Sequence, residues 1–120
     1  MALRRIELPD ARVLALDDVG DPRGVPVVYL HGTPDSRLAR HPDDGRAAAV
    51  GVRLLAIDRP GAGDSSFDPS ADHGSLGRDL GVVLDTLGID EVGLLGWSSG
   101  GLAALGAASV LGPRVRSVAL

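Results

Sequence analysis

The sequence predicts an α/β fold with a mostly parallel sheet and helices on both of its faces. Short apolar runs alternate with segments of helical spacing along the whole chain, which is typical of βαβ units. Several runs are nearly continuous rather than alternating with polar residues, as expected for strands that are buried on both faces. Three of them end in glycine-rich turns, at His31, Asp58 and Trp97. Functional residues of such sheets lie beyond the carboxyl ends of the strands, so these three turns are candidates for parts of one site.

Six apolar segments are predicted to be strands. The first two precede the turn-forming sequence of residues 20–24, which is rich in Gly, Asp and Pro. The middle three are the buried runs that end in the glycine-rich turns, and the last begins after Gly112 and Pro113. The predicted strands are residues 3–8, 13–19, 25–30, 52–57, 91–96 and 115–120.

Three segments are predicted to be helices. The first starts at Asp35 or Ser36, runs to Val50 and is interrupted near Pro42. The second covers residues 75–87, has leucine and valine on one face and ends at Gly88. The third is the alanine-rich segment 98–111.

The composition of the chain excludes several classes of function. The chain has 120 residues, and 44% of them are hydrophobic, enough for the core of one domain. The net charge is -4, and all twelve basic residues are arginines scattered along the chain, which argues against a nucleic-acid partner. Without cysteine, the chain has no disulfide, thiolate metal site or cysteine nucleophile. The first ten residues do not form a secretory signal and no run is long enough to span a membrane, so we expect a cytoplasmic protein without a membrane partner.

The third glycine-rich turn, Gly96-Trp97-Ser98-Ser99-Gly100, fits the Gly-x-Ser-x-Gly pattern of a nucleophile elbow. In an elbow, a strained turn between strand and helix exposes the serine hydroxyl, and the flanking glycines let the strand and the helix approach closely. The backbone N–H of Ser99 would then lie at a helix start and suit an oxyanion. The alternative is a plain glycine-rich turn with no catalytic role.

The turn His31-Gly32-Thr33-Pro34 is a candidate for the other half of an oxyanion hole. Gly32 allows a tight turn, after which the N–H of Thr33 can point at a carbonyl oxygen, whereas Pro34 has no N–H to donate. The alternative is an ordinary turn with a buried structural His31.

The remaining polar candidates are predicted to have no catalytic role. Asp58 is expected to brace neighbouring loops from its turn rather than to serve as a catalytic acid. His41 and His73 are expected on the surface, and because no two histidines have helical metal-binding spacing, neither a metal nor a cofactor is predicted.

Taken together, the three turns resemble those of the α/β-hydrolase superfamily, in particular small bacterial esterase-like and proline-iminopeptidase-like serine hydrolases. The resemblance covers essentially the whole chain. It implies Ser98 as the nucleophile, the N–H groups of Thr33 and Ser99 as the oxyanion hole, and Trp97 beside the elbow, where it touches substrate. It also implies a small-molecule acyl substrate. The dehalogenase and epoxide-hydrolase branches, which use aspartate as nucleophile, do not fit a serine here.

One departure from that family is clear. In this fold the triad follows the order Ser, then Asp or Glu, then His. Residues 99–120 contain no Asp, Glu or His. The chain is therefore interpreted as a partial α/β-hydrolase domain, residues 1–120, truncated after about the sixth strand. Its last strand would be an open apolar edge, through which self-association is expected.

Three hypotheses remain open. The first is a serine hydrolase that acts on an ester, amide or similar acyl compound. The second is a catalytically inactive fragment or half-domain. The third is acyl transfer or cofactor-free oxidative chemistry on the same scaffold, which fold alone does not distinguish.

Overall fold

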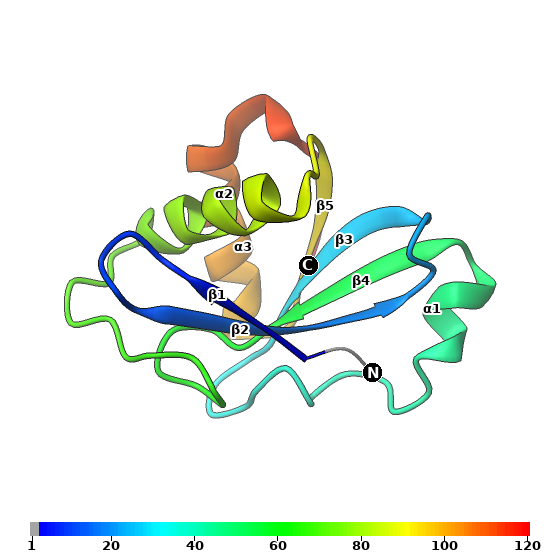
Figure 1. Ribbon diagram of the computed structural model, residues 1–120, viewed down its shortest axis with the longest axis horizontal. Helices are drawn as coiled ribbons and strands as arrows, with labels where there is room; N and C mark the ends of the chain where they lie inside the picture. The colour runs from blue at the N-terminus through cyan, green and yellow to red at the C-terminus, as the bar shows by residue number, and fades with distance from the viewer. Residues whose placement is uncertain (1–2) are drawn as a thin grey trace.

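The computed structural model describes residues 3–120 and shows one mixed sheet with three α-helices (Figure 1). Met1 and Ala2, the first residues of the segment predicted not to be a secretory signal, lie outside the described residues. The strands are β1 (Leu3–Glu7), β2 (Val13–Gly20), β3 (Val25–Leu30), β4 (Val52–Ile57), β5 (Val92–Gly96) and β6 (Val115–Ala119). The helices are α1 (Gly45–Ala49), α2 (Ser75–Leu87) and α3 (Ser99–Leu111), and a 3₁₀ turn covers Gly112–Arg114. The α/β class predicted from the sequence is confirmed.

The strand order brings the three glycine-rich turns to one edge of the sheet. The order is β1-β2-β4-β3-β5-β6, in which β4, β3, β5 and β6 are parallel and β1 and β2 are antiparallel to their neighbours. Leu30, the last residue of β3, lies opposite Ile57 of β4 on one side and Gly96 of β5 on the other. The turns that follow these three strands therefore start side by side.

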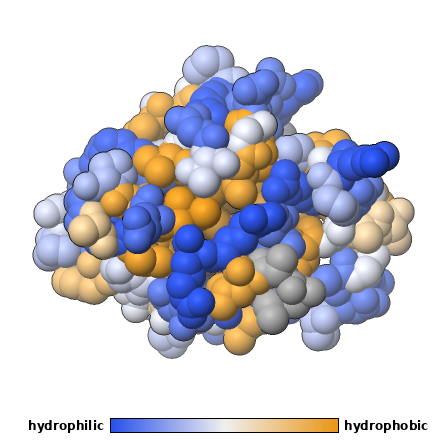
Figure 2. Space-filling view, in the orientation of Figure 1, coloured by the Kyte–Doolittle hydropathy of each residue, from blue (hydrophilic) through white to orange (hydrophobic). Residues whose placement is uncertain are grey.

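The hydrophobic core lies between the sheet and the pair α2 and α3. Figure 1 shows both helices on one side of the sheet, and Figure 2 shows hydrophobic residues between α2 and the β1–β2 pair. Nearly all of the core is aliphatic. Its fully enclosed members include Leu14, Leu16, Val28, Leu30, Leu55, Ile57, Leu80, Val83, Leu84, Ala104 and Ala107. No helix within residues 3–120 combines the length and the apolar character that crossing a bilayer requires.

The opposite face of the sheet is covered differently from the prediction. The helix expected from residue 35 or 36 to Val50 is wrong, because only Gly45–Ala49 is helical and residues 31–44 run as turns and loop. Pro42 has no N–H to continue a helix. The arginines of the segment extend to carboxylates on neighbouring strands instead, and the hydroxyl of Tyr29 donates to the carbonyl of Ala39. Tertiary contacts thus replace the helix hydrogen bonds.

β6 forms one edge of the sheet. It pairs with β5 alone among the described strands, and residues 116–120 are exposed. Val118 is 38% exposed and Leu120 73% exposed. An apolar edge strand with free backbone groups can pair with another chain. Self-association through this edge stays a prediction.

Candidate active site

Ser98 occupies a strained position between β5 and α3. Its backbone has φ 56° and ψ -124°, and outside glycine only Ala11 also has a positive φ among the described residues. Such a conformation costs on the order of 1–3 kcal/mol and persists only where the surroundings enforce it. The side chain of Ser98 is exposed at the carboxyl edge of the sheet. The sharp turn therefore presents the hydroxyl to solvent.

Close packing of α3 against β3 enforces this turn. Gly100 is buried, and a Cβ there would overlap the carbonyl oxygen of Leu30 and lie 2.7 Å from that of His31. Gly96, the buried last residue of β5, meets the backbone of Gly100 and Gly101 in the same way. Because side chains are absent at these points, the first turn of α3 lies directly on the ends of the strands.

The turn after β3 lies against the elbow. A Cβ on the buried Gly32 would lie 3.2 Å from the Cβ of Ser98, and the hydroxyls of Thr33 and Ser99 are 2.9 Å apart. Within residues 3–120, the backbone N–H groups of Thr33 and Ser99 donate no hydrogen bond to the protein. The structure thus brings Thr33 and Ser99, the two residues whose amides the sequence singled out, into contact beside Ser98.

His31 is buried in this turn and both of its ring nitrogens are engaged. Nδ1 lies 2.6 Å from the carbonyl oxygen of Gly32, and Nε2 accepts the backbone N–H of Arg59 at 3.0 Å. These contacts indicate a neutral ring with its proton on Nδ1. His31 therefore holds two turns together and has no free nitrogen to accept a proton from Ser98.

The other two histidines are exposed. His41 accepts the N–H of Asp43 and contacts Arg46, and His73 lines a cavity next to Ser99. No histidine within the described residues forms a hydrogen bond with the hydroxyl of Ser98. The general base that a serine nucleophile needs is not among these contacts.

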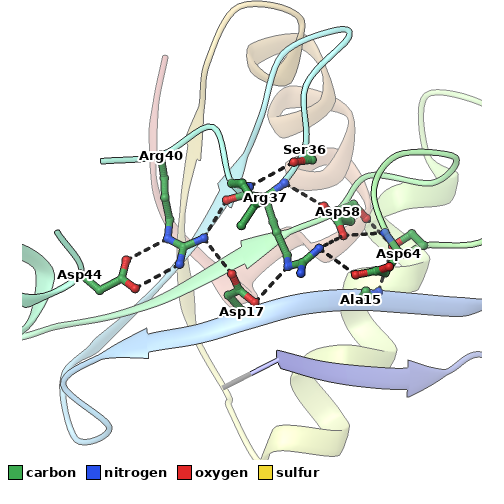
Figure 3. Close-up of polar contacts among 10 residues, drawn as sticks. Ala15, Asp17, Ser36, Arg37, Arg40, Asp44, Asp58 and Asp64 are labelled. Carbon is green, nitrogen blue, oxygen red and sulfur yellow. Dashed lines mark hydrogen bonds and ion pairs between the residues drawn. The ribbon is translucent and has the colours of Figure 1, made fainter. Parts of the chain in front are cut away.

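Asp58 links the turn after β4 to the turn after β3. Its buried carboxylate accepts the backbone N–H of Arg37 at 2.8 Å, Nη1 of Arg37 at 2.6 Å and the N–H of Asp64 at 2.9 Å (Figure 3). All of the hydrogen bonds that this carboxylate accepts come from loop residues, and none of them involves Ser98. The geometry agrees with a bracing role for Asp58.

A second carboxylate, Asp17 of β2, completes what we call the arginine clasp, formed by Asp17, Arg37, Arg40, Asp44 and Asp58. Asp17 has no exposed surface; it accepts Nε of Arg37 at 3.0 Å and Nη1 of Arg40 at 2.9 Å. Arg40 also donates to both carboxylate oxygens of Asp44, at 2.9 and 3.1 Å. Figure 3 shows the two guanidinium groups side by side with these carboxylates around them. The clasp fixes residues 37–44 over the sheet and so fixes the segment that follows Thr33.

The aspartate–arginine pairs also predict a dependence of stability on pH. Hydrogen bonds from Arg53, and then from Arg4, lower the pKa of Asp18, and Arg40 lowers that of Asp44. A carboxylate whose pKa is lower in the folded state stabilises the fold above its unfolded pKa and loses that contribution as pH falls through the folded pKa. The free energy of unfolding should therefore decrease as pH is lowered from about 5 to about 2.

Urea denaturation followed by circular dichroism at a series of pH values measures this decrease. In the variant Asp18→Asn the contribution of one pair is absent at every pH, so its stability should approach that of the parent chain in acid. Asp90→Asn, at an exposed carboxylate outside the described ion pairs, serves as the control. A stability gap that stays constant across this range would contradict the assignment.

Two further positions complete the site. Trp97, between β5 and Ser98, is 66% exposed and lines an apolar groove with Tyr29, Leu54 and Leu95 on the sheet face opposite α2 and α3. Arg59 follows Asp58; its Nη1 donates to the carbonyl of His31 at 2.9 Å and to the hydroxyl of Ser99 at 3.1 Å. In the described part of the chain, no three His, Asp or Glu side chains are grouped as metal ligands would be.

Comparison with known proteins identifies the fold family. The family model for the alpha/beta hydrolase fold matches residues 25–120. The chain belongs to the α/β-hydrolase superfamily. The structure is similar to that of an esterase from Rhodococcus sp. ECU1013, with a TM-score of 0.83 and 29% identity over 98% of this chain and 44% of that one.

Two curated relatives carry other activities in their names. The acetyltransferase component of the acetoin cleaving system of Pseudomonas putida is 33% identical over 113 residues, which are 91% of this chain and 30% of that protein. Bifunctional epoxide hydrolase 2 of Sus scrofa is 32% identical over 99 residues, 80% of this chain and 18% of the relative. The chain thus spans less than half the length of each of these three proteins.

Sequence reasoning missed the arginine clasp and Arg59. Asp17 and Asp18 offered one usable signal, because two consecutive aspartates stand in the middle of an otherwise apolar strand. Aspartate is unfavourable in a buried strand unless it is paired, so a partner arginine could have been sought. Which arginine pairs with it depends on the tertiary arrangement.

Proposed function

We propose that this chain contributes the nucleophile and the oxyanion hole of a serine hydrolase that acts on an ester, amide or similar acyl compound. The observation that carries the proposal is the strained, exposed Ser98, beside which the backbone N–H groups of Thr33 and Ser99 donate to no other described residue. Preorganised donors of this kind stabilise the negative charge that develops on a carbonyl oxygen during acyl transfer. The esterase-like structural relatives support the same reaction class.

In the proposed reaction, Oγ of Ser98 forms a bond to the acyl carbon while its proton passes to a general base. The carbonyl electron pair moves onto oxygen, and the resulting oxyanion accepts hydrogen bonds from Thr33 and Ser99. Collapse of this intermediate breaks the bond to the alcohol or amine, which leaves with the proton and gives an acyl-serine. Water then attacks the acyl-serine and releases the acid.

The base and its acid partner are proposed to come from polypeptide other than these 120 residues. Both nitrogens of His31 are engaged, and neither His41 nor His73 bonds to Ser98. A serine hydroxyl without a base is a weak nucleophile. An inactive fragment or half-domain is accordingly the alternative for the chain by itself.

Acyl transfer is a second candidate, because two of the relatives are named as acetyltransferases. The first half of the reaction would be the same, and an alcohol or thiol would replace water in attacking the acyl-serine. The described residues of the site support the formation of an acyl-serine and are equally compatible with either acceptor.

The test is labelling of the purified chain with a fluorophosphonate probe, in the absence and presence of imidazole as an added base. We expect labelling that requires Ser98 and increases with imidazole concentration. Ser98→Ala should abolish it, whereas Ser109→Ala, which removes an exposed hydroxyl near the end of α3, should not.

Each outcome separates the alternatives. Labelling without imidazole would show that a base acts within the chain or between copies of it. A folded chain that stays unlabelled at every imidazole concentration would contradict the proposal and favour the inactive fragment. Circular dichroism establishes the folded state in every sample.

A further inference from the structure

Arg59 differs from every other partly buried arginine. Among the described residues, five such arginines form ion pairs with aspartates: Arg12, Arg37, Arg40, Arg53 and Arg114. Arg59 is also partly buried but forms no ion pair with any carboxylate of residues 3–120. Burial lowers the pKa of its guanidinium, and no carboxylate offsets that effect. A partly buried charge without a counter-charge is costly, so an unpaired arginine at a candidate active site calls for an explanation.

The guanidinium of Arg59 keeps one edge free. Both of its side-chain hydrogen bonds use Nη1, which donates to the carbonyl of His31 and the hydroxyl of Ser99. Its Nε and Nη2 contact no acceptor within residues 3–120. Arg53 uses this same Nε–Nη2 edge to bind both oxygens of Asp18. Such paired donors match the two oxygens of a carboxylate.

Two cavities lie beside the turn after β3 and the start of α3. One, of about 500 Å³, is lined by His31 and Thr33 of the turn after β3 and by Phe67. The other, of about 300 Å³, is lined by Ser99, Leu102 and His73. Arg59 lines both. Nη1 of Arg59 also donates to the hydroxyl of Ser99, the residue that follows Ser98, so a ligand bound at Ser98 would have this guanidinium nearby.

The acidic residues of these cavities do not neutralise Arg59. Asp35 lines the larger cavity and is exposed. Asp72 lines the smaller one, where its carboxylate accepts the N–H groups of Gly74 and Ser75 and pairs with Arg78. Neither carboxylate lies within ion-pair distance of Arg59.

We propose that Arg59 binds a carboxylate on the substrate, so that the preferred acyl compounds are anionic, with the carboxylate held beside the ester or amide that Ser98 attacks. The assignment of this anion as a substrate rests on the proposed function, whereas the carboxylate-binding site itself does not. Apolar neighbours such as Leu102 and Phe67 favour a short hydrocarbon chain between the two groups.

The test compares two probes that differ by one charge, monomethyl succinate and its neutral analogue dimethyl succinate, by NMR titration of the ¹⁵N-labelled chain. The monoanion should bind about tenfold more tightly, a difference of about 1.4 kcal/mol, because its carboxylate accepts charge-assisted hydrogen bonds that the neutral ester cannot form. Arg59→Gln should remove this preference, so that the ratio of the two affinities falls to about one. Arg59→Lys, which keeps the charge but not the paired donors, should retain part of it.

Arg78→Gln is the matched control, because it removes an exposed arginine that lies near the same cavity. The proposal is overturned if neither ester binds, if both bind equally, if Arg59→Gln keeps the preference, or if Arg78→Gln loses it to the same extent. Should Arg59→Gln fail to fold, the Arg59→Lys variant decides, and an unchanged preference there would overturn the role of the paired donors.

The same titrations on Ser98→Ala separate this inference from the proposed function. A preference that survives in Ser98→Ala and depends on Arg59 supports the carboxylate site even if fluorophosphonate labelling fails. Labelling at Ser98 without any preference for the monoanion would leave the hydrolase proposal intact and refute the carboxylate site.

Discussion

Replacing Gly100 with alanine should lower the free energy of unfolding by about 3 kcal/mol, even though alanine is the better helix former. The new Cβ would overlap the backbone carbonyl of Leu30 and crowd that of His31. Backbone atoms at a strand end cannot turn aside as a flexible side chain can. The first turn of α3 would have to move away from β3, and the strained turn at Ser98 would relax with it. Urea denaturation followed by circular dichroism measures the loss.

Gly81→Ala provides the matched control for this substitution. Gly81 also lies inside a helix, α2, but a Cβ there would meet only a side-chain atom of Leu111, at 3.8 Å. This variant should be more stable than the parent by about 0.5–1 kcal/mol. If the two variants changed stability in the same direction, the close approach of α3 to β3 would not be the cause.

Asp17→Asn should be destabilising by about 3 kcal/mol as well. The fully buried carboxylate receives one donor from Arg37 and another from Arg40. An asparagine can accept from one of them, but its amide group would place further donors against the other. The partly buried guanidinium groups of Arg37 and Arg40 would then both lose the negative charge of Asp17, which partly neutralises them in the parent chain.

Hydrogen exchange extends this test to the site. Because the clasp fixes residues 37–44, amide exchange in that segment should accelerate in Asp17→Asn more than exchange in α2. Asp90→Asn should change stability by no more than about 0.5 kcal/mol. A loss below about 1 kcal/mol in Asp17→Asn would show that Asp44 and Asp58 suffice to hold the two arginines.

The strands and the two long helices could be predicted because their signals are local. The buried runs of β3 and β4 match residues 25–30 and 52–57, and α2 starts and ends at the predicted residues. In α2, leucines and valines recur at helical spacing and Gly88 adopts the left-handed conformation that ends a helix. These features depend on neighbours a few residues away.

The segment between residues 35 and 50 could not be predicted in the same way. Its conformation depends on hydrogen bonds from Arg37 and Arg40 to carboxylates about twenty residues away along the chain. Contacts at such a separation produce no periodic pattern of residues in the sequence. The free edge of Arg59 is a similar case, since whether an arginine is paired is known only once every carboxylate has been placed. The three turns themselves were found by motif, while their mutual contact depends on β3 lying between β4 and β5.

The exposed Trp97 can serve as an intrinsic fluorescence probe of the protein. It is the one tryptophan of the chain and lies next to Ser98, so intrinsic indole fluorescence comes from a single known place. Because the ring is already in contact with water, its emission should shift little on unfolding, and it is a poor probe of stability. Any partner that covers the groove of Tyr29 and Leu95, or any acyl group that shields the ring, should instead shift the emission to shorter wavelength. A titration monitored at one wavelength would then detect occupancy of the site directly.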